Sequence, residues 1–121
     1  MVADLFHYGH VNFLRQASSH GDFLLVGIHA DETVETYKRT PILTMQERIA
    51  SVEGCRYVDE VVPNAPLEIT REWIEKHDID LIMHGDDVSP ETRDTVRRAD
   101  RNGHLSVSRL HRGHFDHRAY L

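Results

Sequence analysis

Residues 5–17 read LFHYGHVNFLRQA, and the rest of the chain is organised around this stretch. His7 and His10 stand three residues apart, with Gly9 before the second, where the pattern predicts that a loop becomes a helix over 11–20. A helix N-terminus offers unpaired N–H groups and the positive end of the macrodipole, which suits phosphate. Glycine leaves room for a ligand, and imidazole donates hydrogen bonds or carries a proton near neutral pH. The stretch therefore indicates a site that stabilises charge on a triphosphate.

Strand and helix patterns alternate along the chain and predict an α/β fold. The continuous apolar run over 23–28 is typical of a strand buried on both faces of a parallel sheet. Further strands are expected over 57–62, 81–84 and 105–110. A short helix is expected to begin at residue 31, where Asp and Glu suit its first turn. Further helices are expected over 44–52, 67–77 and 90–101. This alternation predicts a parallel sheet flanked by helices, with the ligand at the carboxyl ends of the strands.

Composition restricts the classes of function. The 121 residues suit one domain with a single core, and the net charge of −6 argues against broad nucleic-acid binding. The single cysteine, Cys55, excludes an internal disulfide and suits a reducing compartment. No apolar run approaches the ~20 residues of a membrane span. We therefore expect a cytoplasmic protein without a leader or a membrane segment.

Several short motifs follow one another in order: DLFHYGH at 4–10, GIHAD at 27–31, YKRTP at 37–41, QER at 46–48, CRYVDEVV at 55–62, NAP at 64–66 and HGDD at 84–87. Together they closely resemble the cytidylyltransferases of the HxGH nucleotidyltransferase superfamily, especially the choline-phosphate and ethanolamine-phosphate enzymes. Glycerol-3-phosphate cytidylyltransferase is a more distant relative. The resemblance implies a Rossmann-like nucleotidyltransferase domain, which we place at residues 1–110.

The resemblance also implies an activity. The phosphate of a phosphorylated small alcohol (phosphoethanolamine, phosphocholine or glycerol 3-phosphate) would attack the α-phosphorus of CTP, forming a CDP-alcohol and pyrophosphate. Positioning and electrostatic stabilisation would supply the catalysis, with Mg²⁺ accompanying the nucleotide. We expect a homodimeric enzyme whose partners are these small molecules, with neither nucleic acid nor membrane involved. An adenylyltransferase of the same superfamily and a catalytically impaired remnant that only binds nucleotide are the alternatives.

The family pattern assigns roles residue by residue. The catalytic residues would be His7, His10 and Lys38. The nucleotide-binding residues would be Asp4, Gly9, Asp31, Gly85, Asp86 and Asp87, and the acceptor-binding residues Lys38, Arg48 and Asp59. By themselves these residues also fit ordinary structural roles: an N-cap for Asp31, a helix salt bridge for Arg48, a solvated side chain for Lys38 and a strand-edge position for Asp59. Trp73 is assigned to the core.

Two departures from the family pattern stand at the ends of the sequence. Relatives carry a central hydrophobic strand just before the position of Asp4, and its apparent absence predicts a gap in the sheet. Relatives also carry an Arg-Thr-x-Gly-Ile-Ser-Thr-Thr motif where residues 111–121 form an atypical tail. Codons permitted for residues 112–120 can be read one base later as Glu-Gly-Ile-Ser-Thr-Thr-Glu-Leu. We therefore interpret the tail as that motif out of frame, and expect it to be poorly packed.

The tail also offers a competing constellation of metal ligands. Three histidines recur at a spacing of three, with further candidate ligands nearby; the set is His104, His111, His114, Asp116 and His117. Gly113 weakens the helix that would align them, and the frame interpretation accounts for them without a metal. We therefore predict no metal site formed by protein ligands.

Overall fold

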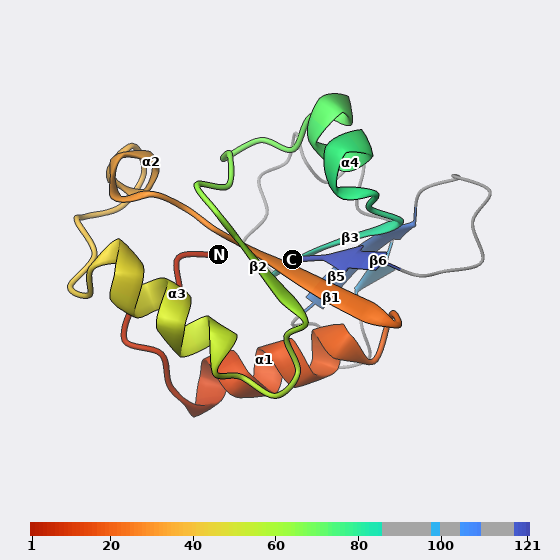
Figure 1. Cartoon of the computed structure of the whole chain (residues 1–121), viewed down its shortest axis with the longest axis horizontal. Helices are drawn as coiled ribbons and strands as arrows, with labels where there is room; N and C mark the ends of the chain where they lie inside the picture. The colour runs from red at the N-terminus through yellow and green to blue at the C-terminus, as the bar shows by residue number, and fades with distance from the viewer. Residues whose placement is uncertain (86–97, 100–104, 110–117) are drawn as a thin grey trace.

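A computed structural model describes residues 1–85, 98–99, 105–109 and 118–121, with only the backbone given for 84–85, 98–99 and 105–109. The described strands form one sheet in the order β2-β1-β6-β3-β5-β4. The helices are α1 (Tyr8–Ser18), α2 (Asp31–Glu35), α3 (Met45–Glu53) and α4 (Arg71–His77). The strands are β1 (Phe23–Ile28), β2 (Glu60–Pro63), β3 (Leu81–Gly85), β4 (Arg98–Ala99), β5 (Leu105–Arg109) and β6 (Arg118–Tyr120). Figure 1 shows α4 on one side of the sheet and α1 and α3 on the other.

The α/β architecture predicted from the sequence is confirmed. β1 has the predicted bounds, and β2, β1, β6 and β3 are mutually parallel. β5 and β4 extend the sheet in antiparallel fashion, beyond the parallel arrangement that we expected. The helix predicted over 90–101 is wrong at 98–99, which form β4; the rest of that range lies outside the described residues.

The apolar side chains of the sheet alternate between two clusters. Leu24, Val26 and Ile28 of β1 pack with residues of α1 and α3 on one face. Leu25 points to the opposite face, where Trp73 and other residues around α4 cover it. A strand buried on both faces reads as a continuous apolar run, which explains the pattern at 23–28. The assignment of Trp73 to the core is confirmed, since it packs against this second cluster.

The gap that we predicted in the middle of the sheet is filled by the end of the chain. β6 lies between β1 and β3 and runs parallel to both. Leu121 continues its ladder, because its N–H donates to Leu25 O at 2.9 Å and its carbonyl accepts from Gly27 N at 3.0 Å. Met1 also bonds to β1, because its N-terminal amino group donates to Gly27 O at 2.7 Å. The expectation of a poorly packed tail is therefore wrong for 118–121, since Ala119, Tyr120 and Leu121 are buried. The rest of the tail lies outside the described residues.

Arg118 fixes the beginning of β6. Its backbone N–H donates to Asp80 Oδ2 at 3.0 Å, and its guanidinium donates to the carbonyl of His77 at 3.2 Å. The same guanidinium lies over the ring of Phe23, 4.5 Å from the ring centroid. One side chain thus joins β6 to the C-terminal end of α4 and to β1.

Gly27 and Tyr120 depend on each other sterically. A Cβ at Gly27 would overlap the hydroxyl of Tyr120 and lie 2.7 Å from Ala65 Cβ. Because overpacking a buried site is destabilising, we expect Gly27→Ala to lower the free energy of unfolding by about 1–3 kcal/mol. Adding Tyr120→Phe removes the overlapping hydroxyl and recovers part of that loss. Urea unfolding of the two single variants and the double variant measures this coupling.

Gly54 provides the matched control. It ends α3 with an ordinary φ of −74°, and a Cβ there would approach its nearest neighbours at 3.6 Å. Gly54→Ala should therefore leave the free energy of unfolding nearly unchanged. Equal stability of Gly27→Ala and Gly54→Ala would contradict the seating of Tyr120 over β1.

Candidate functional site

An open pocket of about 750 Å³ lies beside the N-terminus of α1. Its walls are the first four residues of the chain, one side of α1, Val34, and the segment 38–41. Five of the residues singled out from the sequence line it together: Asp4, His7, Gly9, His10 and Lys38. The structure thus brings the predicted catalytic residues to one cavity.

The two histidines cap the helix that they introduce. His7 is the N-cap of α1, and its Nδ1 accepts a hydrogen bond from Gly9 N at 2.9 Å. The backbone N–H of His7 in turn donates to Nδ1 of His10 at 3.2 Å. The ring of His7 folds over Gly9 so closely that a Cβ there would lie 2.7 Å from its Cε1. Gly9 is therefore required by the position of this ring.

These hydrogen bonds fix the tautomer that each ring adopts when it is neutral. A nitrogen that accepts an N–H carries no proton, so each neutral ring holds its proton on Nε2. The ring centroids lie 4.3 Å apart, and His7 is exposed. Desolvation, and then the neighbouring His7, lower the pKa of His10, which keeps its ring neutral at pH 7. The beginning of α1 therefore presents two Nε2–H donors, together with the positive end of the helix dipole, to an anion.

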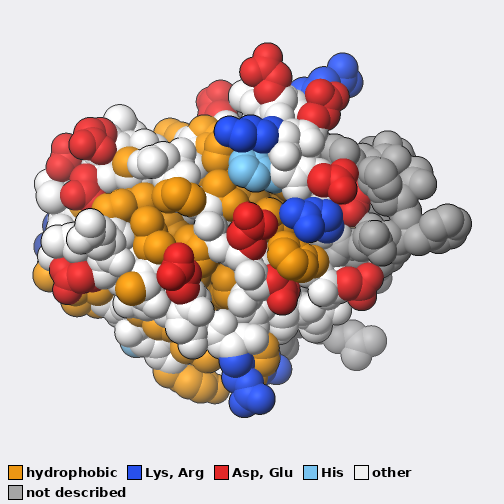
Figure 2. Space-filling model, in the orientation of Figure 1, with side chains coloured by type: hydrophobic (Ala, Val, Ile, Leu, Met, Phe, Trp, Pro, Cys, Tyr) orange, Lys and Arg blue, Asp and Glu red, His pale blue; other side chains and the backbone are white. Residues whose placement is uncertain are grey.

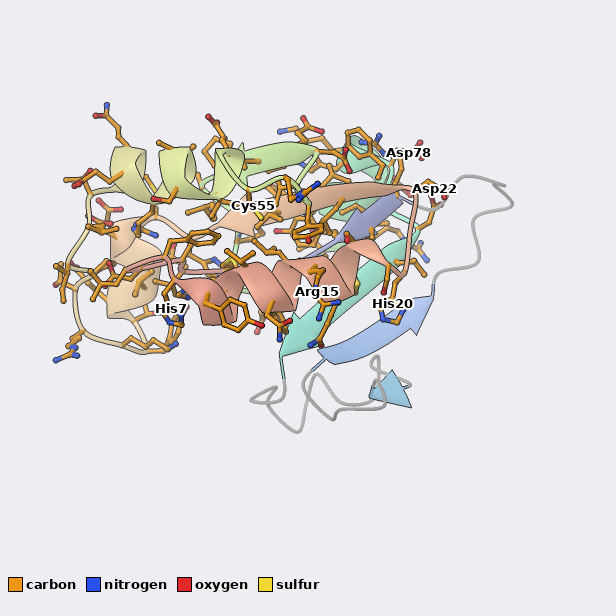
Figure 3. The ribbon with its side chains drawn as sticks, turned by 90° about the horizontal axis from the view of Figure 1, so that it is seen from below. His7, Arg15, His20, Asp22, Cys55 and Asp78 are labelled. Atoms are coloured by element: carbon orange, nitrogen blue, oxygen red, sulfur yellow. The ribbon has the colours of Figure 1, made fainter. Side chains whose placement is uncertain are left out.

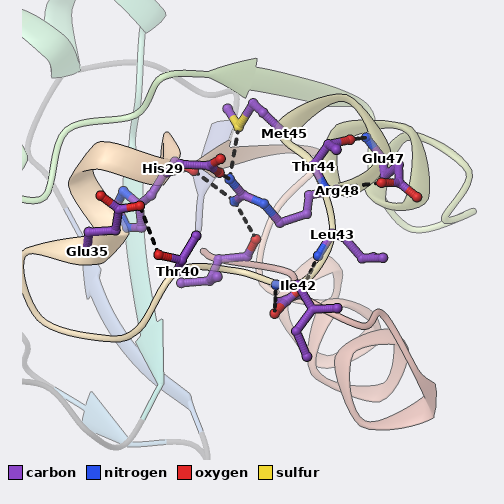
Figure 4. Close-up of polar contacts among 12 residues, drawn as sticks. His29, Glu35, Thr40, Ile42, Leu43, Thr44, Met45, Glu47 and Arg48 are labelled. Atoms are coloured by element: carbon purple, nitrogen blue, oxygen red, sulfur yellow. Dashed lines mark hydrogen bonds and ion pairs between the residues drawn. The ribbon is translucent and has the colours of Figure 1, made fainter.

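Asp4 ties the N-terminal segment to the opposite wall of the pocket. Its two carboxylate oxygens accept from Ile42 N and Leu43 N, each at 2.9 Å (Figure 4). These backbone hydrogen bonds, the one from Ile42 first, lower the pKa of the carboxyl group. Asp4 thus holds in place the segment that follows the Lys38–Pro41 wall.

Arg48 is fully buried next to this region, where its guanidinium connects three segments of the chain (Figure 4). Its guanidinium donates to Val2 O at 2.9 Å, to His29 O at 2.8 Å and to Asp31 Oδ1 at 2.5 Å. It therefore joins the N-terminal segment, the end of β1 and the start of α2. In this arrangement Arg48 and Asp31 position the backbone around the pocket, and their direct contact with ligands stays a prediction.

The remaining predicted residues lie elsewhere. The carboxylate of Asp59 accepts from Leu24 N at 2.8 Å, near the beginning of β1 and therefore away from the carboxyl edge of the sheet. Its role in acceptor binding stays a prediction. Gly85 is the last residue of β3, on the carboxyl edge, and Asp86 and Asp87 lie outside the described residues.

Sequence reasoning missed two residues that line the pocket and one ring pair outside its lining. Asn12 and Gln16, one helical turn apart on α1, line the pocket, and their i, i+4 spacing was the available signal. His29 and Tyr37 form an edge-to-face ring pair beside Lys38, with centroids 6.4 Å apart. Nothing in the sequence indicated that pair, since the two residues come from different elements.

Surface charge agrees with a small-molecule site. On the face shown in Figure 2, the described Lys and Arg side chains lie in small separate groups among Asp and Glu.

Across the part of the chain that the structure describes, no helix is long and apolar enough to span a bilayer. No group of three or more potential metal-ligating side chains gathers within these described residues, and the tail histidines lie outside them.

Comparison with known proteins identifies the family. The sequence model of the cytidylyltransferase-like family matches residues 2–111. Ethanolamine-phosphate cytidylyltransferase of Mus musculus is 43% identical over 102 residues, covering 83% of this chain and 25% of the relative. The enzyme of the same name from Arabidopsis thaliana is 54% identical over 84 residues, 68% of this chain and 20% of the relative. Choline-phosphate cytidylyltransferase A of Homo sapiens is 41% identical over 87 residues, which cover 70% of this chain and 24% of the relative.

This chain belongs to the cytidylyltransferase-like family, because the family model covers most of its length. The resemblance inferred from the HxGH stretch and the motifs that follow it is confirmed. The chain spans about a quarter of the length of these curated relatives.

The cap formed by His7 can be tested by stability alone. His7→Ala removes the acceptor for Gly9 N, so we expect it to lower the free energy of unfolding by about 1 kcal/mol. His7→Asn keeps a side-chain acceptor suited to a helix N-cap, so its free energy of unfolding should be close to that of the parent chain. Urea unfolding measures both, with His20→Ala as a control at the far end of α1 (Figure 3). A His7→Ala variant as stable as the parent chain would rule out the cap.

The histidines also predict how stability depends on pH. The pKa values of His10, His29 and His77 are lowered, in each case chiefly by desolvation. The unfolded chain therefore takes up these protons first as the pH falls below about 6.5, the ordinary histidine pKa. We expect the free energy of unfolding to fall between about pH 7.5 and pH 5.5. Urea unfolding across this interval measures the slope, and His10→Asn should make it shallower. A rise in stability toward acid pH would contradict this expectation.

Proposed function

We propose that this chain transfers CMP from CTP to a phosphorylated small alcohol, forming a CDP-alcohol and releasing pyrophosphate. Its relatives are named ethanolamine-phosphate and choline-phosphate cytidylyltransferases, which supports this reaction. The single observation that carries the proposal is the pair of Nδ1-anchored rings at positions 7 and 10, which leaves two Nε2–H donors beside an open pocket. Donors fixed before the reaction suit the charge that develops on a triphosphate as its α-phosphorus is attacked.

The reaction requires one bond to form and one to break. A phosphate oxygen of the acceptor forms the new bond to the α-phosphorus of CTP. The bond between that phosphorus and the oxygen bridging to the β-phosphate breaks, and pyrophosphate leaves with the electron pair. His7 and His10 stabilise the added charge on the phosphates through hydrogen bonds, so their Nε2–H groups donate without transferring a proton. No covalent intermediate with a side chain is required.

Lys38 is suited to the acceptor side of this reaction. It lines the same pocket as the two histidines and lies within the segment 36–41, between α2 and α3. Its ammonium is 5.6 Å from the centroid of the Tyr37 ring. A compact charge on a flexible stem can contact both the α-phosphate and the incoming phosphomonoester.

Mg²⁺ is proposed to enter with the nucleotide. Asp4 is the carboxylate that lines the pocket among the described residues, and its oxygens already accept two backbone N–H groups. A single such carboxylate suits a Mg²⁺ ion that is held mostly by phosphates and water. When bound, the ion would neutralise charge on the triphosphate.

We further propose a homodimer in the cytoplasm. The free, buried thiol of Cys55 suits a reducing compartment. Leu5, Tyr8 and Ile42 expose large apolar side chains, which is a feature of surfaces that associate. Light scattering during size-exclusion chromatography measures the mass, and a monomer at micromolar concentration would contradict the dimer.

The activity is tested by supplying CTP and Mg²⁺ with phosphoethanolamine, phosphocholine or glycerol 3-phosphate, and measuring both pyrophosphate and the CDP-alcohol. His7→Asn keeps the helix cap but lacks the Nε2–H donor. We expect it to reduce kcat on the order of 100-fold, the usual effect of losing a donor to a developing oxyanion. His20→Asn, at the opposite end of α1, should retain the parent activity.

The outcomes separate the proposed function from its alternatives. CDP-alcohol formation that depends on His7 supports the transferase. Turnover with ATP in place of CTP would show that the chain is an adenylyltransferase instead of a cytidylyltransferase. Binding of CTP without product from any acceptor would identify a remnant that only binds nucleotide.

A further inference from the structure

Arg39 is a second cation on the Lys38–Pro41 wall of the pocket. It lines the same cavity as His7 and His10, and its side chain is exposed. Within the part of the chain that the structure describes, its guanidinium has neither a hydrogen-bond partner nor an ion-pair partner. An arginine without a partner beside a pocket has all of its side-chain N–H groups available to a ligand.

The backbone on both sides of Arg39 is held in place. The N–H of Lys38 donates to Val34 O at 2.8 Å, which ties this residue to α2. The hydroxyl of Thr40 donates to Glu35 Oε1 at 3.0 Å (Figure 4). A segment that is ordered before a ligand arrives loses less conformational entropy on binding. The side chain of Arg39 therefore reaches into the pocket from an anchored stretch of the wall.

The other side chains of this wall leave the binding of an anion to the two cations. The single proton of the Thr40 hydroxyl is already donated, and Pro41 has no side-chain donor. Lys38 and Arg39 are thus the side-chain donors that the wall offers. Asp4 is the carboxylate among the described residues that line the pocket, and its oxygens accept two backbone N–H groups. The wall is therefore locally positive, although the chain carries a net charge of −6.

The two cations suit different phosphates. An ammonium is a compact point charge, and Lys38 is proposed above to contact the α-phosphate and the incoming phosphomonoester. A guanidinium is a planar fork that binds two oxygens at once. The β- and γ-phosphates of CTP offer such neighbouring oxygens, and they leave together as pyrophosphate. The leaving group gains negative charge as its bond breaks, so a cation paired with it stabilises the transition state more than the bound substrate.

We propose that Arg39 binds the β- and γ-phosphates of CTP and stabilises the pyrophosphate that leaves. This inference rests on the proposed transferase function and deepens it. As the acceptor oxygen bonds to the α-phosphorus, the bond to the bridging oxygen breaks, and its electron pair leaves with pyrophosphate. Arg39 keeps all of its protons throughout, because a guanidinium does not lose one in a protein. The same contact makes the pocket selective for a nucleoside triphosphate over a monophosphate.

Calorimetric titration separates the two ends of the nucleotide. The ligands are CTP, CMP and pyrophosphate, each with Mg²⁺, and the variants are Arg39→Gln and Arg39→Lys. We expect Arg39→Gln to weaken the binding of CTP and of pyrophosphate roughly tenfold to a hundredfold, as for a lost hydrogen bond to a charged group. Its affinity for CMP should stay nearly unchanged. Arg39→Lys keeps the charge but lacks the fork, so its affinity for CTP should lie between those of the parent chain and Arg39→Gln.

Arg71 provides the matched control. It is exposed and begins α4, which lies on the other side of the sheet from α1 (Figure 1). Arg71→Gln makes the same change of charge away from the pocket, so it should bind the three ligands as the parent chain does. In the assay with CTP and phosphoethanolamine, Arg39→Gln should lower kcat/KM for CTP roughly tenfold to a hundredfold. The KM for phosphoethanolamine should stay nearly unchanged.

The results distinguish a failed inference from a failed function. If CDP-alcohols form but Arg39→Gln keeps the parent affinity for CTP and pyrophosphate, the proposed role of Arg39 is wrong and the transferase stands. The same holds if the binding of CMP weakens equally, or if Arg71→Gln weakens binding as much. If no acceptor yields pyrophosphate, the transferase itself fails, and titration with pyrophosphate still decides the inference. Weaker binding to Arg39→Gln than to the parent chain supports it, and equal or absent binding overturns it.

Discussion

The hydrogen bonds made by Nδ1 of His7 and His10 determine what the candidate site can do. At His7 and His10 this atom accepts a backbone N–H, so the free side of each ring is a donor. At His29 the same atom faces a carbonyl, so the free side is an acceptor. The unpaired N–H groups at the start of α1 have to be satisfied, and the rings that satisfy them line the pocket where we propose that the triphosphate binds. Capping by Nδ1 thus leaves Nε2–H of the same two rings available for the proposed ligand.

Polar contacts of the buried Arg48 and of the more exposed Asp4 hold the walls of the pocket together. Arg48 joins the N-terminal segment to the ends of β1 and the start of α2, and Asp4 joins that segment to the backbone at 42–43. An arginine with no exposed surface has to be paired and hydrogen-bonded, because burying an unpaired charge is costly. These contacts give Asp4, Arg48 and Asp31 a structural role at the site, and their predicted contacts with ligands stay predictions.

Local patterns predicted the elements that depend on local chemistry. The run at 23–28 gave β1, and Thr44 with Glu47 gave the capping box that opens α3. β6 could not be predicted, since it has three residues and owes its place to pairing with strands distant in sequence. The HxGH stretch revealed the two donors, because its spacing is local. The contacts of Arg48 and the tautomer of His29 depend on carbonyls of Val2 and Ala65, which only the folded chain brings near.

The protonation states of the imidazoles are the most direct test of this account. Long-range ¹H–¹⁵N correlation spectra of the histidine side chains, assigned with single-histidine variants, report which nitrogen holds the proton in each neutral ring. We predict the Nε2–H form for His7 and His10 and the Nδ1–H form for His29. On addition of CTP, Nε2 of the first two should shift. The Nδ1–H form at either His7 or His10 would contradict the account, because a protonated Nδ1 could neither cap α1 nor turn Nε2–H toward the triphosphate.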